Sequence, residues 1–151
     1  MQVDEHRPRW NLRDRPGYLV VRLARLMSRY AEERIHPLGT GLAGYPVINA
    51  LTECGEMTQK QLTEHLGVEQ SSTAQLLSRL ERDGFVTRRK DPDDGRSSFI
   101  RLTEKAADAL PAISDIMDSG NDLAVEGFSR QEVEQVIALL KRMLANFEPH
   151  Q

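Results

Sequence analysis

The sequence predicts a mainly α-helical protein with one small β hairpin, built as a winged helix-turn-helix with further helices on both sides. Three observations predict this fold class. Apolar residues recur at helical spacing through most of the chain. Two short amphipathic segments are joined by a tight turn at Gly67. Directly after them the periodicity becomes that of strands, around a turn-rich segment at 91–96.

The length of 151 residues fits one domain with its own core, so we expect a single unit over 1–151. We place the winged helix at about 45–102 and the flanking helices at about 12–36 and 103–147. The one cysteine, Cys54, excludes an internal disulfide, and we expect a buried, inert thiol. No apolar run approaches the roughly 20 residues of a membrane span, and no signal-peptide core is visible. A cytoplasmic protein without membrane contact is expected.

The first helix is predicted over 17–34. Pro37 and the glycines that follow it end this helix and form a loop. A second helix is expected from about 45 to 53, with Pro46 in its first turn, where the missing N–H costs little. The apolar positions of the first helix are Leu19, Leu23, Leu26, Met27 and Tyr30.

The next two helices form the predicted helix-turn-helix. Thr58 and Gln61 have capping-box spacing at the start of the first of them, and Gly67 closes it. The second follows after a short turn and ends at Gly84. The residues expected to face the core are Leu62, Leu66, Leu76, Leu77 and Leu80.

A β hairpin is predicted from the change to two-residue periodicity after Gly84. The two strands are 85–90 and 97–102, and the turn-forming residues at 91–96 connect them. A helix-turn-helix followed at once by a hairpin is a winged helix, in which a helix enters the major groove of DNA and the hairpin reaches the neighbouring minor groove.

Two more helices are expected after the hairpin. Thr103 has the position of an N-cap for a long helix, and Ser129 and Glu132 have capping-box spacing for a last helix. Their apolar stripes could form an intrachain core. Since a compact monomer of this size does not need both helices, we expect them to form a homodimer together with the first helix.

The overall charge does not suggest nucleic acid, because the formal net charge is −3. The charge of the segment from position 70 to position 90 differs from that of the whole chain. Between positions 70 and 90 the chain carries five cations and two acids, which gives +3. A nucleic-acid footprint depends on the local field rather than on total charge. On charge alone, an ordinary solvated face is an equally good interpretation.

Residues 62–106 resemble the MarR family of bacterial transcription factors. The similarity rests on Ser71-Ser72, on the run Leu-Glu-Arg-Asp-Gly-Phe-Val-Thr-Arg-Arg at 80–89, and on Asp94-x-Arg96. The resemblance implies a homodimer that binds a pseudo-palindromic operator on double-stranded DNA and represses transcription. It also implies a small-molecule effector, often an aromatic acid, as an inducer.

The predicted DNA contacts on the helix-turn-helix follow from how recognition helices work. The N-terminal part of such a helix reads base edges, and glutamine can pair bidentately with adenine. Arginine further along the helix meets phosphate, and so does the N-terminus of the preceding helix. We therefore expect contacts from Gln70, Ser71, Ser72, Thr73 and Gln75 to bases, and from Arg79, Thr58 and Gln59 to phosphate.

The wing adds a second set of predicted contacts. Arg96 lies among turn formers, and arginine suits the negative potential of a narrow minor groove. Asp94 is close enough in sequence to hold the Arg96 guanidinium bidentately and fix its direction. Arg88 and Lys90 lie at the base of the wing, where we expect phosphate contacts.

The N-terminal segment offers candidate effector residues. Trp10, Arg15, Tyr18 and Arg22 combine aromatic and cationic groups, which suits an aromatic carboxylate. Two other interpretations stay open: Trp10 as an anchor of the dimer, and the arginines as solvated or paired groups.

An enzyme is not expected, because no metal-ligand cluster, phosphate loop or nucleophile motif is found, and no cofactor or metal is predicted. The alternative function is a winged-helix module for protein–protein contact without specific DNA binding, since the fold does not dictate the function. Such a module would not need Arg96 or a polar recognition helix.

Overall fold

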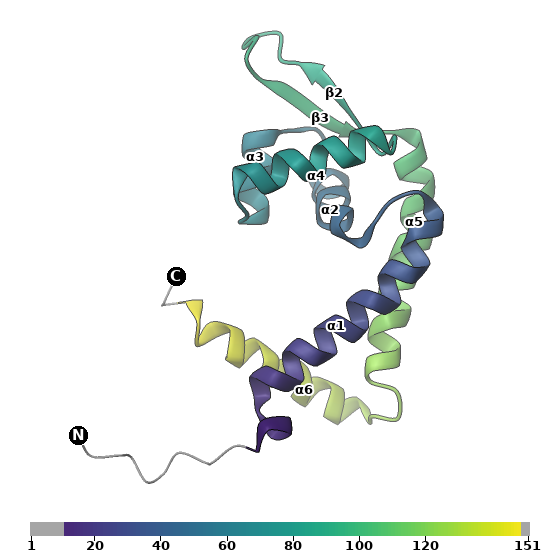
Figure 1. Ribbon diagram of the computed structural model, residues 1–151, viewed down its shortest axis with the longest axis vertical. Coiled ribbons are helices and arrows are strands. Elements are labelled where there is room, and N and C mark those ends of the chain that lie inside the picture. Colours follow the sequence, from purple (N-terminus) through teal and green to yellow (C-terminus); the bar gives the residue numbers. More distant parts are fainter. Residues whose placement is uncertain (1–10, 149–151) are drawn as a thin grey trace, which may run out of the picture.

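The computed structural model describes residues 11–148, with a winged helix at one end and long helices projecting from it (Figure 1). Within that range, no helix is long and apolar enough to cross a membrane. Short 3-10 turns lie at Leu12–Asp14, His36–Leu38 and Leu42–Gly44. The helices are α1 (Pro16–Ile35), α2 (Tyr45–Cys54), α3 (Gln59–Leu66), α4 (Gln70–Arg82), α5 (Glu104–Ala124) and α6 (Arg130–Ala145). The strands are β1 (Met57–Thr58), β2 (Val86–Lys90) and β3 (Ser98–Leu102).

The core lies inside the winged helix. It joins α2, α3, α4 and the sheet to the C-terminal end of α1 and the N-terminal half of α5. Leu62 and Leu77 are fully buried and Leu80 is nearly so, which confirms the predicted inward faces of α3 and α4. Burial of these large apolar side chains makes the winged helix a rigid platform, because interiors pack as densely as organic crystals.

The sheet has three strands in the order β1-β3-β2, one more than the predicted hairpin. In the extra strand, Met57 pairs with Ile100 and Thr58 pairs with Phe99. A strand of two residues is too short to show a two-residue periodicity, so no sequence pattern predicts β1. Through this pairing the residues just before α3 are fixed against the wing.

The predicted helix starts are confirmed by their hydrogen bonds. The Gln61 N–H donates to Thr58 Oγ1 at 3.2 Å, and the Thr58 N–H donates to Gln61 Oε1 at 2.8 Å. Ser129 and Glu132 form the second capping box, and the Ser129 N–H lowers the pKa of the Glu132 carboxyl by hydrogen bonding to it. Gly67 ends α3 with a φ of +62°, a conformation that favours glycine.

The start of α5 is bonded to the end of α4. The Thr103 hydroxyl accepts from the Ala106 N–H at 3.2 Å and donates to the Gly84 carbonyl at 2.6 Å. The Lys105 ammonium donates to the Asp83 carbonyl at 2.7 Å. A cation at a helix C-terminus stabilises the carbonyls that lack partners there. The orientation of α4 is therefore tied to that of α5.

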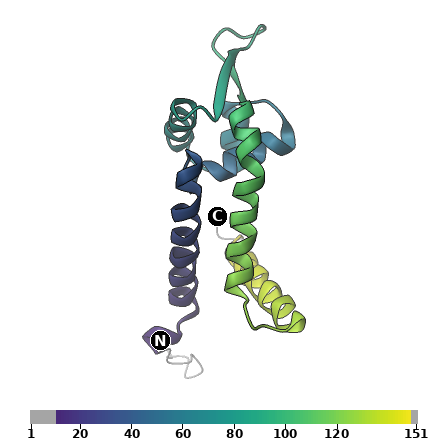
Figure 2. The same ribbon diagram turned by 90° about the vertical axis from the view of Figure 1, so that its right-hand side faces the viewer.

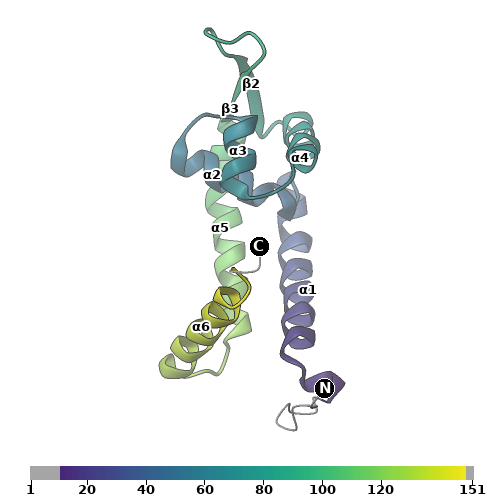
Figure 3. The same cartoon turned by 90° about the vertical axis from the view of Figure 1, so that its left-hand side faces the viewer.

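Three helices form what we call the stem: α1, α5 and α6. Figures 2 and 3 show α1 and α5 extending from the winged helix, with α6 at their far end. Unlike the other helices, α6 contains no buried residue. Its apolar stripe is left uncovered within a single chain.

One prediction about the core was wrong. Cys54 is exposed rather than buried. Helical spacing from Val47 and Leu51 would place it on the inner face of α2, but Cys54 is the last residue of that helix. The end of α2 lies beyond the packed core.

Candidate nucleic-acid interface

A polar groove forms where the N-termini of α3 and α4 meet the wing, and its volume is about 300 Å³. It brings together four of the predicted DNA contacts from three different elements. Sequence reasoning missed Lys60, next to Gln59 in the first turn of α3, and the serines that follow Arg96. The groove contains three cations and no carboxylate. Its lining is Gln59, Lys60, Gln70, Arg88, Arg96, Ser97 and Ser98.

The outer face of α4, the recognition helix, carries three more of the predicted contacts. Ser71 and Gln75 are exposed and, four residues apart, lie on one side of the helix, opposite the buried Leu77 and Leu80. Ser72 is also exposed. Hydrogen-bonding side chains are thus free on the surface that a groove of DNA would meet.

Thr73 does not belong to that surface, and its prediction as a DNA contact was wrong. Its side chain is fully buried, and its hydroxyl donates to the Glu69 carbonyl at 3.2 Å. The physical reason is helical spacing, because Thr73 precedes Leu77 by four residues and Leu80 by seven. The same periodicity that predicted the core leucines places Thr73 among them.

The prediction for Asp94 was also wrong in its chemistry. Asp94 Oδ1 accepts from the backbone N–H of Arg96 at 3.0 Å, and the Asp94 carbonyl accepts from the Ser97 N–H at 2.9 Å. No ion pair joins Asp94 to the Arg96 guanidinium in the described structure. Aspartate in a turn commonly bonds the backbone two residues on. Asp94 shapes the turn and leaves the guanidinium of Arg96 free.

The two arginines at the base of the wing face opposite sides. Arg88 donates to Glu81 at 3.0 Å and to Gln59 at 3.4 Å. Arg89 donates to Glu56 at 2.6 Å and lies 5.1 Å from the centre of the Phe99 ring. Alternation along β2 separates them.

Lys90 and Arg79 lie outside the groove. Lys90 is exposed at the end of β2 and forms no ion pair within residues 11–148. Arg79 lines a separate hollow of about 130 Å³ on the other flank of α4, between that helix and the loop before α2, together with Glu32 and Asp83. The structure therefore does not bring either residue into the groove with the other predicted contacts.

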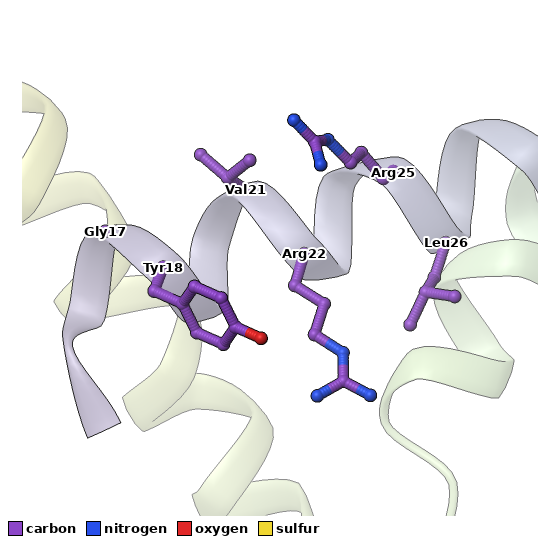
Figure 4. Close-up of a pocket in the computed structure, with 6 residues that line it drawn as sticks. All are labelled: Gly17, Tyr18, Val21, Arg22, Arg25 and Leu26. Carbon is purple, nitrogen blue, oxygen red and sulfur yellow. The ribbon is translucent and has the colours of Figure 1, made fainter. Parts of the chain in front are cut away.

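The predicted effector residues are only partly brought together. A hollow of about 620 Å³ on α1 is lined by Tyr18 and Arg22 but not by Arg15 (Figure 4). Trp10 lies outside the described residues. Arg25, which the sequence reasoning missed, also lines the hollow and follows Arg22 by three residues, although Figure 4 shows the two side chains pointing to different sides of the helix.

The burial of Thr73 gives a direct test. We expect Thr73→Val to leave DNA affinity unchanged, because the lost hydroxyl faces the Glu69 carbonyl inside the protein. Gln75→Ala should weaken binding by about 1–3 kcal/mol, the range for one bidentate base contact. A fluorescence titration of labelled promoter DNA measures both. A loss with Thr73→Val as large as that with Gln75→Ala, in a normally folded protein, would contradict the burial argument.

Comparison with known proteins agrees with this geometry. Residues 47–98 match the model of the MarR family. The PcaV transcriptional regulator from Streptomyces coelicolor is 26% identical with a TM-score of 0.79, over 89% of this chain and 98% of that one. A MarR transcriptional regulator from Methanosarcina mazei Go1 is 24% identical with a TM-score of 0.78, over 89% and 97%. A mutant MarR from E. coli, complexed with operator DNA, is 23% identical with a TM-score of 0.75, over 85% and 92%. Residues 47–98 thus match the MarR family, and the chain has the fold of MarR transcriptional regulators over most of its length.

Proposed function

We propose that this protein is a sequence-specific repressor of transcription that binds a pseudo-palindromic operator as a homodimer and responds to a small molecule. One observation carries the DNA-binding part: the cationic groove, formed by residues distant in sequence, lies beside the exposed polar face of α4. A local excess of cations next to hydrogen-bonding side chains supplies both phosphate affinity and base readout.

Each group on this surface has a proposed role. Ser71, Ser72 and Gln75 read base edges in the major groove, with Gln70 at the entry of the helix. Arg96 enters the neighbouring minor groove. Phosphates of the backbone between the two grooves are held by Gln59, Lys60 and Arg88, by backbone N–H groups that follow Thr58, and by Arg79 and Lys90 at the margins.

The proposal of a homodimer rests on uncovered apolar surface. Within residues 11–148, every large hydrophobic residue that is strongly exposed, apart from Val68, lies on the stem or its short flanking segments. Monomeric proteins rarely expose contiguous apolar patches of that kind. A second copy related by a two-fold axis would cover the stem and present two recognition helices to half-sites about one helical turn apart, which requires a palindromic operator.

The proposed effector site is the hollow on α1. Its volume of about 620 Å³ lies in the range of small-molecule pockets. The Tyr18 ring can pack against an aromatic ring, and the Arg22 guanidinium can bind a carboxylate bidentately. PcaV offers a parallel, since its structure in complex with its natural ligand is 25% identical to this chain, with a TM-score of 0.72 over 92% of this chain and 98% of that one.

Arg96 provides the main test of DNA binding. We expect Arg96→Ala to weaken binding to DNA from upstream of the protein's own gene by about 1–3 kcal/mol, and binding by the wild type to fall steeply with salt. Arg130→Ala is the matched control, because it removes the same charge from the exposed surface of α6. Binding that is absent or independent of salt in the wild type would overturn the proposal and favour a module for protein–protein contact.

The dimer can be tested on α6. Leu140→Glu places a charge on the exposed apolar stripe of that helix, so we expect dissociation into monomers and a loss of operator affinity. Val68→Glu, at the exposed apolar residue outside the stem, should leave the mass unchanged in sedimentation equilibrium. A wild type that sediments as a monomer at micromolar concentration would contradict this part of the proposal.

The effector site predicts a pattern of thermal stabilisation. Benzoate and hydroxybenzoates serve as probes, and a ligand at 100 times its dissociation constant stabilises by about 2.7 kcal/mol. We expect Arg22→Gln to abolish the thermal stabilisation by these probes and Arg15→Gln to preserve it, because of these two arginines only Arg22 lines the hollow. An equal loss of stabilisation in both variants would place the ligand elsewhere.

A further inference from the structure

The Arg88 side chain bridges the wing to both helices of the helix-turn-helix. Its Nε–H donates to Glu81 Oε2 at 3.0 Å, and its Nη1–H donates to Gln59 Oε1 at 3.4 Å. Glu81 belongs to the C-terminal half of α4, and Gln59 begins α3. A single guanidinium therefore fixes the distance between elements that must meet DNA together.

Glu81 and Gln59 differ in where they hold Arg88. Gln59 and Arg88 line the cationic groove, whereas Glu81 does not. Glu81 thus bonds only the Nε–H of the guanidinium, and the Nη1 group bonds Gln59, which lines the groove together with Arg88. The Arg88 side chain keeps 30% of its exposed area, so the cation remains accessible.

We propose that Glu81 is a positioning residue for DNA binding, which acts through Arg88. The inference rests on the proposed function, since it assigns to Arg88 a phosphate contact in the groove. A free arginine side chain loses rotamer freedom when it binds phosphate, and a side chain already held in place loses less. Glu81 supplies that preorganisation while it leaves the terminal nitrogens available for bidentate bonds.

Simple electrostatics predicts the opposite effect of removing Glu81 on the DNA affinity. A carboxylate near DNA repels phosphate, so its removal should tighten binding. For Glu81 this gain is small, because the Arg88 cation already compensates its charge at 3.0 Å. Glu69 provides the contrast: it precedes α4 as its N-cap residue, and its side chain makes no capping hydrogen bond. The two acids on one helix should therefore respond in opposite directions.

The test is a titration of labelled DNA at several salt concentrations with variants of the full chain. We expect Glu81→Ala to weaken binding by about two- to tenfold, the range for ordering one long side chain, and to leave the salt slope unreduced, because Arg88 is still present to bind phosphate. Glu81→Gln keeps an oxygen acceptor for the Arg88 Nε–H and should restore most of the affinity. Glu69→Ala should tighten binding without reducing the slope.

Two further variants separate positioning from general stability of the wing. Glu56→Ala breaks the ion pair with Arg89 on the opposite face and should leave the DNA affinity nearly unchanged. In an Arg88→Gln background, Glu81→Ala should no longer weaken binding and should tighten it slightly, because the group through which it acts is gone and its carboxylate has no compensating cation. A loss of affinity that persists in that background, or an equal loss of affinity with Glu56→Ala, would overturn the inference.

The inference and the proposed function fail in different ways. If the wild type binds DNA with the expected salt dependence and Glu81→Ala tightens binding as Glu69→Ala does, only the positioning role of Glu81 is overturned. If the wild type itself does not bind DNA, both are overturned.

Discussion

The bonds between the end of α4 and the start of α5 are the constraint on which the rest of the molecule depends. Thr103 bonds the Gly84 carbonyl and Lys105 bonds the Asp83 carbonyl, both in the turn that ends the recognition helix. Lys105 also lies 5.1 Å from the centre of the buried Phe85 ring. Any rotation of α5 must therefore either carry α4 with it or break these bonds. Through these bonds, a movement of the stem would also move α4, whose exposed polar face we propose to contact DNA.

The stem and the winged helix satisfy their apolar surface in different ways. The core of the winged helix also includes the C-terminal end of α1 and the N-terminal half of α5, whereas α6 has no buried residue and α1 buries only Ala31 and Ile35. A helix in water gains most of its stability from packing one apolar face, and the homodimer proposed above would cover the exposed faces of α1 and α6. Folding and assembly are consequently expected to be linked for this part of the chain.

Acidic side chains shape the DNA-reading surface even though they repel DNA. Asp94 bonds the backbone of Arg96, Glu81 bonds Arg88, and Glu56 bonds Arg89. In each case the carboxylate orders a wing residue rather than facing the groove, whose lining contains no acid. A chain with a net charge of −3 can thus present a locally cationic surface, because most of its acids are placed elsewhere.

The sequence by itself determined the local features: the caps at Thr58 and Ser129, the end of α3 at Gly67, the core leucines and the wing. These features depend on periodicity and on hydrogen bonds between residues three or four apart, and both can be predicted from the sequence alone. The burial of Thr73 could have been predicted in the same way, from its helical spacing to Leu77 and Leu80. Only the tertiary structure decided that β1 pairs with β3, that Arg88 meets Glu81 and Gln59, and that Cys54 lies beyond the core. Such contacts join residues up to 43 positions apart, and their partners are set by how the elements pack against one another, which no local pattern records.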